Sequence, residues 1–231
     1  MNSTKGTYPV IREKQNIKAL QKAGGFAALI HAAGYTVGII LAFTLIAPAL
    51  SAAPAEYMAF VSNNQLLMSL WILSAYWVSA AALVVMVLAI YEYLKDNSPA
   101  LMQVATIFGL IWAGLIIGSG NLMIHDFGVI ANLYGEDPIQ AETVLLAMKA
   151  VENGIVSGNE LVGSLWVLLL SLAALRTKGL PKGLNYLGMI LSVAGILTLL
   201  PAVPTYIFGL GMIVWSIWLG VALLRKPASQ E

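Results

Sequence analysis

The residues of this sequence that could do chemistry are few, and most of them lie where an apolar stretch begins or ends. His125 and Asp126 end one such stretch, and Asn159 and Glu160 begin the next. Asn121 precedes His125 by four residues, so these two side chains share one face of a helix. A histidine beside carboxylates can serve a metal ion, a proton or a polar headgroup. The same side chains can also form a hydrogen-bonded latch between two helices, and the sequence leaves these readings open.

A second candidate lies inside the first apolar stretch, where Tyr35 follows His31 by one helical turn. A buried histidine at this position either bonds to a neighbouring helix or ligates haem. A single haem held by both His31 and His125 is disfavoured, because the two residues lie at different depths in the predicted membrane. By helical rise, His31 lies about 11 Å from one edge of its span, and His125 about 36 Å along its own. The sequence leaves the cofactor unknown, and no HExxH-type spacing supports a catalytic metal.

Composition defines the class of protein that must position these residues. Of 231 residues, 59% are hydrophobic and 10% are charged, whereas soluble domains carry roughly 25% charged residues. This excludes an ordinary soluble enzyme and a disordered chain. The net charge of +1 gives no nucleic-acid footprint. The absence of cysteine excludes thiolate chemistry and disulfides.

Apolar segments predict an all-α, polytopic membrane helix bundle with six transmembrane helices. A spanning helix needs roughly 20 apolar residues. The fifth segment is the shortest, and the turn that follows it is too short for anything but an antiparallel hairpin with the sixth. The segments are Gly24–Leu50, Leu66–Leu94, Leu101–Ile124, Ile155–Leu175, Leu184–Leu200 and Tyr206–Leu224.

Charge placement predicts the orientation. If both termini are cytoplasmic, eleven of the 12 basic residues face the cytoplasm, and only Lys149 faces outward, as the positive-inside rule requires. The sequence therefore predicts a protein of the cytoplasmic (inner) membrane. The eleven are Lys5, Arg12, Lys14, Lys18, Lys22, Lys95, Arg176, Lys178, Lys182, Arg225 and Lys226.

Three parts of the chain follow from this topology. Residues 1–23 form a basic cytoplasmic segment, either a surface helix on anionic lipid or a solvated leader. Residues 24–226 form the transmembrane domain, and residues 227–231 a C-terminal tail. Within the domain, an Asp137 N-cap and Pro138 predict an amphipathic outer helix near 138–152.

Glu160 is drawn into the membrane by the length of the fourth span. Leu161–Leu175 covers only about 22 Å, short of the roughly 30 Å hydrocarbon core. The helix must therefore include Asn159 and Glu160, which places Glu160 at the outer hydrocarbon edge. Polar groups in a bilayer are costly, so each is a functional-site hypothesis.

Two patterns concern helix packing. The tetrapeptide at Ile107–Leu110 recurs at Ile207–Leu210, a faint echo of the inverted repeats of transporters. Pairs of small residues four apart predict close helix contacts within the molecule, or an oligomer face. They are Gly34 and Gly38, Ala75 and Ser79, Gly114 and Gly118, and Ser216 and Gly220.

The C-terminal half resembles a known family. The carrying segments are Gly158-Asn-Glu-Leu-Val-Gly-Ser-Leu-Trp166, Gly179-Leu-Pro-Lys-Gly-Leu-Asn-Tyr-Leu-Gly188 and Trp215-Ser-Ile-Trp-Leu-Gly220. They resemble the bacterial membrane proteins catalogued as domain of unknown function 4386. The resemblance implies a multi-pass membrane protein and transfers no activity and no residue role.

Three function hypotheses follow. The first is a non-enzymatic binding, sensory or accessory protein with an outward-facing polar pocket, because no catalytic spacing is present. The second is a small secondary transporter or proton-coupled carrier, suggested by Glu160 and the faint repeat. The third is an outer-leaflet enzyme using His125, Asp126 and Glu160. The expected partners are the lipid bilayer and a second copy or a larger membrane complex, and not nucleic acid.

Overall fold

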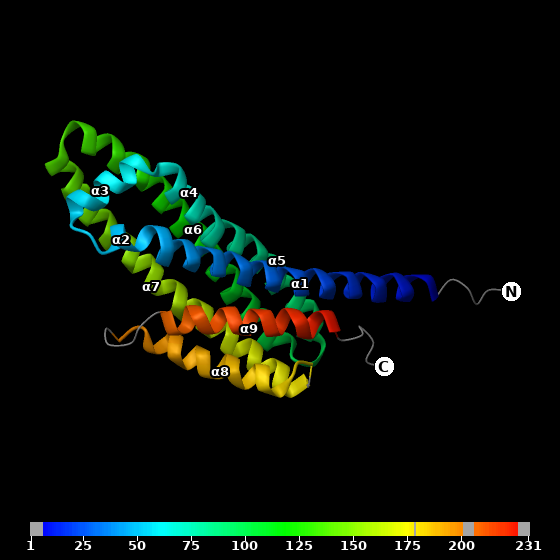
Figure 1. The fold of residues 1–231 in the computed structure, drawn as a ribbon. Helices are drawn as coiled ribbons and strands as arrows, with labels where there is room; N and C mark the ends of the chain where they lie inside the picture. The colour runs from blue at the N-terminus through cyan, green and yellow to red at the C-terminus, as the bar shows by residue number, and fades with distance from the viewer. Residues whose placement is uncertain (1–6, 178, 201–205, 226–231) are drawn as a thin grey trace.

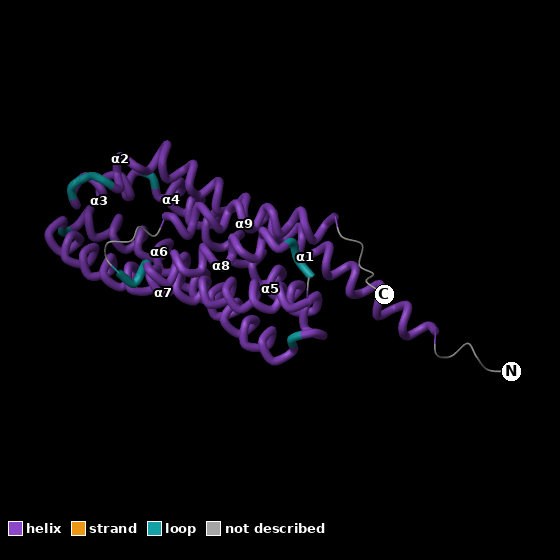
Figure 2. The backbone as a smooth tube through the Cα atoms, turned by 90° about the horizontal axis from the view of Figure 1, so that it is seen from below, coloured by secondary structure: helices purple, strands orange, loops and turns teal. Residues whose placement is uncertain are grey.

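The computed structural model describes residues 7–177, 179–200 and 206–225. In these ranges every regular element is a helix, joined by short connections (Figure 2). The all-α class predicted from the sequence is therefore confirmed. The elements are α1 (Thr7–Leu41), η1 (Ala42–Ile46), α2 (Ala47–Leu50), α3 (Pro54–Asn63), α4 (Gln65–Ile72), η2 (Leu73–Val78), α5 (Ser79–Leu94), η3 (Lys95–Asn97), α6 (Pro99–Glu136), α7 (Pro138–Thr177), α8 (Lys182–Leu197) and α9 (Tyr206–Arg225).

The helices run roughly side by side, and the bundle has two distinct ends (Figure 1). We call proximal the end toward which α1 begins and α9 finishes, and distal the end that holds α3 and the turn between α6 and α7. α1 packs against α5 and α9, and α7 packs against α6 and α8. The basic N-terminal segment is helical from Thr7 and continues without a break into the first span.

Five helical stretches within the described residues are long and apolar enough to cross a membrane. Their lipid-sized lengths and exposed apolar side chains, such as Ile190 and Val214 on α8 and α9, imply embedding in a bilayer. The predicted fifth span is the exception, because α8 has only 16 residues and ends at Leu197. At about 24 Å it is shorter than the hydrocarbon core. The long stretches are Asn16–Leu50, Gln65–Leu94, Pro99–Glu136, Pro138–Thr177 and Ile207–Arg225.

Helices α6 and α7 form a hairpin longer than a bilayer is thick. They have 38 and 40 residues, or about 57 and 60 Å. The predicted cap is present, because Asp137 Oδ1 accepts from the backbone N–H groups of Ile139 and Gln140 at 3.1 Å each. The helix expected near 138–152 does not end there, however, and is the first part of α7. Apolar side chains at its buried face continue the periodicity into the span, so nothing interrupts the helix.

The distal ends of α6 and α7 pack against the short helices that precede the second span. Tyr57 and Met58 of α3 contribute to an apolar cluster there, together with Leu145 of α7. This distal cluster is separate from the main core of the bundle. Its buried members are Ile46, Ala49, Tyr57, Met58, Val61, Met68, Ile72, Phe127, Ile130, Ala141 and Leu145.

Small residues bring α1 close to the second span. A Cβ added to Gly38 would lie 2.5 Å from Ala75 Cβ, and one added to Gly34 would clash with Ser79 Oγ. The two predicted small-residue pairs therefore pack against each other. Gly114 and Gly118 behave differently, since an added Cβ there meets nothing within 4 Å. The prediction of close internal packing at this pair was wrong.

Candidate functional site

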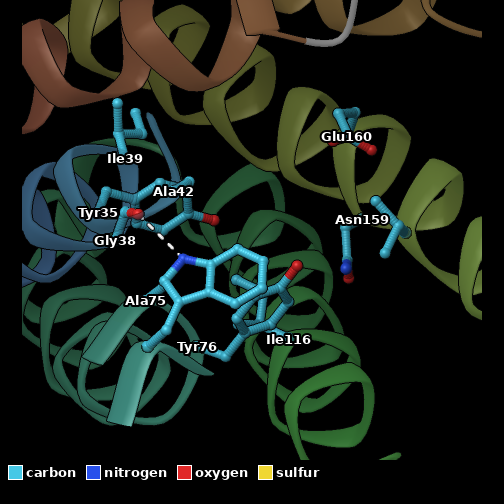
Figure 3. A pocket seen from close by; sticks show the side chains of 11 residues that line it. Tyr35, Gly38, Ile39, Ala42, Ala75, Tyr76, Ile116, Asn159 and Glu160 are labelled. Atoms are coloured by element: carbon cyan, nitrogen blue, oxygen red, sulfur yellow. Dashed lines mark hydrogen bonds between the residues drawn. The ribbon is translucent and has the colours of Figure 1, made fainter. Parts of the chain in front are cut away.

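A cavity of about 210 Å³ lies between α1, η2, α6 and α7 (Figure 3). Aromatic side chains and a carboxylate face it from different helices. Ala42 of η1 and Val156 of α7 complete part of the wall. The lining residues are Tyr35, Gly38, Ile39, Ala42, Trp71, Ala75, Tyr76, Ile116, Val156, Asn159 and Glu160.

Both π-helical segments of the chain's described part border this cavity. Ala42 is the first residue of η1, and Ala75 and Tyr76 lie in η2. A π-helix adds a residue to the turn and shifts the side chains that follow, and such segments occur often at functional sites. Trp71 Nε1 donates to the Gly38 carbonyl oxygen at 2.9 Å (Figure 3). This bond joins the second span to α1 beside the cavity.

Asn159 is buried, and only one of its two side-chain amide atoms has a hydrogen-bond partner among the described residues. Its Nδ2 donates to Ser119 Oγ at 3.3 Å, while the Ser119 hydroxyl donates to the Leu115 carbonyl oxygen at 2.9 Å. Asn159 thus joins α7 to α6. Its Oδ1 is buried and receives no hydrogen bond from the described residues.

Glu160 follows directly on α7 and is half-buried. Its Oε2 is also buried without a donor among the described residues. Two buried acceptors without a donor among the described residues, Asn159 Oδ1 and Glu160 Oε2, therefore belong to residues that line the cavity. Its lining includes no lysine and no arginine. A buried acceptor without a donor is unfavourable, so these atoms favour a donor supplied by water or a ligand.

A smaller cavity of about 40 Å³ adjoins the first and shares Tyr35, Asn159 and Glu160 with it. Trp112 of α6 and Phe208 of α9 line this second space. Their rings stand 6.2 Å apart between centroids. Both side chains are almost completely buried, so together they form an aromatic floor.

His31 lies next to this floor but is bonded to the second span. Its ring nitrogen Nδ1 donates to the Ser79 carbonyl oxygen at 2.9 Å, and Ser79 Oγ donates to the His31 carbonyl oxygen at 3.4 Å. The imidazole packs 4.9 Å from the Tyr35 ring and 5.9 Å from Trp112. His31 therefore braces Tyr35, and of the two only Tyr35 lines the cavity.

The other predicted site residues line different spaces. Asn121 and His125 are exposed on α6, beside a groove of about 450 Å³ that Gly118 and Val151 also line. Asp126 is buried beside Phe127 and Ile130 of the distal cluster. The structure thus brings Tyr35, Asn159 and Glu160 together and separates them from Asn121, His125 and Asp126.

Asp126 borders a space of only about 10 Å³, together with Glu152, Lys149 and Tyr57. The Lys149 ammonium lies 4.3 Å from the centre of the Tyr57 ring. Burial raises the pKa of Tyr57 to about 12, and the carboxyl groups of Glu152 and Asp126 add to this effect. Tyr57 is therefore neutral at physiological pH. The space is too small for more than one water molecule.

No group of three or more His, Asp or Glu side chains in the described part of the chain is arranged to hold a metal ion. The predicted His125, Asp126 and Glu160 set does not form one, because each side chain lines a different cavity.

Comparison with known proteins adds the family. The model of the family described as a domain of unknown function, DUF4386, matches residues 23–226. The chain belongs to this family. No curated protein matches the sequence, and no solved structure matches the fold. Membership agrees with the resemblance found in the C-terminal half and extends it over almost the whole chain.

Sequence reasoning missed three residues of the site in this DUF4386 member: Trp71, Tyr76 and Ser119. Aromatic residues are common throughout membrane helices, so Trp71 and Tyr76 carried no separate signal. Ser119 lies in a small-residue stretch, where its hydroxyl was not distinguished from packing.

Proposed function

We propose that this protein is a membrane-embedded binding protein, in a sensory or accessory role, whose cavity beside Glu160 receives a small ligand from the outer side of the cytoplasmic membrane. One observation carries the proposal. Two buried oxygen acceptors, on Asn159 and Glu160, face a 210 Å³ space and have no donor among the described residues. A binding site typically combines apolar walls with a few convergent polar groups.

The proposed topology has six spans with both termini in the cytoplasm. The proximal end carries Lys95, Arg176 and Arg225 at or next to the ends of α5, α7 and α9, and Lys22 lies in the first half of α1, which supports the assignment of this end to the cytoplasmic side. α1 begins and α9 finishes toward the same end (Figure 1), and this requires an even number of crossings. With five long spans, α8 supplies the sixth, aided by local thinning of the bilayer.

Depth along α7 supports access from the outer side. Glu160 lies about 24 Å along the helix from Arg176. If Arg176 marks the inner boundary, the carboxylate is within a few ångströms of the outer edge of a roughly 30 Å hydrocarbon core. A polar ligand therefore reaches the cavity without crossing the membrane.

Tightly packed tryptophan rings on one side of the cavity favour ligand binding over transport. On the proximal side of the cavity, Trp112, Trp166 and Trp215 pack in sequence with ring centres 5.7 and 5.8 Å apart. All three are almost fully buried. A transport path from Glu160 toward the proximal end would have to pass these packed rings, so we propose binding and not transport.

The sequence echo gives the transporter hypothesis little support. Gly109 packs tightly between Val87 and Trp166, whereas nothing lies near Gly209. Phe208 is buried in the core, while Phe108 is only partly buried. Equivalent positions of a true repeat would share their environments.

A ligand screen on the purified full chain tests the proposal. Ligands that bind the folded state raise its melting temperature. We expect at least one class, among amines, carboxylates and neutral polar molecules, to stabilise the wild type but not Val156→Phe, which fills the cavity. Val214→Phe, the same change on the exposed face of α9, should respond like the wild type. Equal responses of the two variants, or no response of the wild type to any class, would contradict the proposal.

A further inference from the structure

The chemistry of the cavity indicates which class of ligand it takes. Asn159 Oδ1 and Glu160 Oε2 can only accept hydrogen bonds from a ligand while the carboxylate is ionised. The second amide atom, Nδ2, is already bonded to Ser119. Polar contacts from α7 therefore select a ligand that donates hydrogen bonds or carries positive charge.

The aromatic side chains in the cavity wall independently favour a positively charged ligand. Tyr35, Trp71 and Tyr76 come from three different helical segments and line the same space (Figure 3). The indole N–H of Trp71 is bonded to Gly38, so this side chain offers its ring and not its donor. Aromatic faces attract cations, and rings gathered around one space are the usual way to bind quaternary ammonium groups.

The cavity is small and contains no competing cation. None of its lining residues is basic, and Tyr35 is held in place by the His31 ring. Its volume of about 210 Å³ lies below the roughly 300–1,000 Å³ of sites that hold drug-sized ligands. This suits a headgroup-sized molecule and not a drug-sized one.

We propose that this cavity binds a small organic cation, a protonated amine or a quaternary ammonium group, between the carboxylate of Glu160 and the rings of Tyr35, Trp71 and Tyr76. The inference rests on the binding function proposed above and names its ligand class. The cation comes either from a free small molecule or from the headgroup of an amine-bearing lipid.

The test compares choline with 3,3-dimethyl-1-butanol, a neutral molecule of the same shape. Binding to the full chain is measured by calorimetry in phosphatidylglycerol nanodiscs. We expect choline to bind at least about tenfold more tightly, because the neutral molecule lacks the charge that Glu160 and the rings attract. Equal binding of the two probes would overturn the cation assignment.

Variants assign the effect to the named groups. Glu160→Gln should weaken choline binding at least about tenfold, whereas Glu142→Gln, an exposed position on the same helix, should change nothing. If Glu160→Gln fails to fold, Tyr76 provides a second test: Tyr76→Leu should weaken binding about fivefold, and Tyr76→Phe should retain it. Wild-type binding by Glu160→Gln, or equal losses in both Tyr76 variants, would overturn the proposal.

Two further comparisons distinguish failure of the cation assignment from failure of the binding function, and a lipid headgroup from a free amine. If choline and the neutral molecule bind equally and Val156→Phe abolishes the binding of both, the proposed binding function stands and the cation assignment fails. If Val156→Phe changes the binding of neither molecule, both the binding function and the cation assignment fail. Phosphatidylethanolamine added to the nanodiscs should lower the apparent choline affinity when the lipid headgroup is the source of the cation. An unchanged affinity supports a free amine.

Discussion

Buried polar residues in this protein fall into those that are bonded and those that are left open. His31 is bonded to the backbone of the second span, and Ser119 uses its hydroxyl both to donate and to accept. Asn159 is bonded through its nitrogen and open through its oxygen. Leaving an acceptor open in a membrane protein is costly. Asn159 Oδ1 and Glu160 Oε2 are two of several buried polar atoms without a partner among the described residues, and they are the two whose side chains line the 210 Å³ cavity, which is why we propose a ligand there.

The two histidines of the chain allow a matched test at this scale. His31→Ala removes a buried ring that bonds to Ser79 and packs on Tyr35, so we expect a loss of about 2–4 kcal/mol of unfolding free energy. His125 is exposed, and His125→Ala should change stability by less than about 0.5 kcal/mol. Equilibrium unfolding in mixed detergent and SDS measures both. A loss of less than about 0.5 kcal/mol for His31→Ala would contradict a structural role for His31.

The sequence predicted Tyr35, Asn159 and Glu160 because polar or amphipathic groups within apolar spans are conspicuous. It also grouped Asp126 and His125 with Glu160, since all three lie near the ends of neighbouring spans. The structure separates them because neighbouring residues on a helix point about 100° apart, so equal depth does not mean a shared face. Rotation about the helix axis is a tertiary property that span boundaries do not determine.

At the scale of elements, irregular helices form the site. The first two spans each contain a π-helical segment, η1 and η2, beside the cavity. Apolar length predicted that these spans exist but not that their turns would widen, because no proline or glycine within Leu73–Val78 marks the change. The Asp137 cap was predictable, since capping depends on adjacent residues.

Glycines on α1 and α6 give opposite expectations for the same substitution. Gly38→Ala should destabilise the protein by about 1–3 kcal/mol, because the new Cβ would press on Ala75 where α1 meets η2. Gly118→Ala should stabilise it by about 0.5–1 kcal/mol, because alanine favours the helix and the site is open. Thermal unfolding of the two variants measures the difference. Destabilisation of similar size at both positions would contradict the packing described for α6.

At the scale of the whole molecule, the two ends differ in structure and charge. The proximal end consists of helix ends with basic residues, whereas the distal end carries the α6–α7 hairpin and the short helices α2 and α3 (Figure 1). The distal cluster packs against the distal half of the hairpin and so supports α7 on the distal side of Glu160. Length and charge distribution predicted an inner and an outer side, which stays a prediction, whereas the long continuous helices of the α6–α7 hairpin were not predicted.

Because the chain has no cysteine, single cysteines report its topology directly. Six spans predict that Glu142→Cys and Leu199→Cys react with an impermeant thiol reagent applied outside intact cells. Lys182→Cys should react only after the membrane is opened. Leu199 and Lys182 lie at opposite ends of α8, so reaction of both from the same side would show that α8 does not cross.

The most direct test of the central claim, that the cavity beside Glu160 is a ligand site, is a cryo-electron microscopy structure of the full chain in lipid nanodiscs with choline. We expect density for a bound molecule between Tyr35, Tyr76 and Glu160, within hydrogen-bonding distance of the carboxylate or in contact with the rings. A closed space, with α1 packed on α7 and Glu160 paired to a protein group, would contradict it.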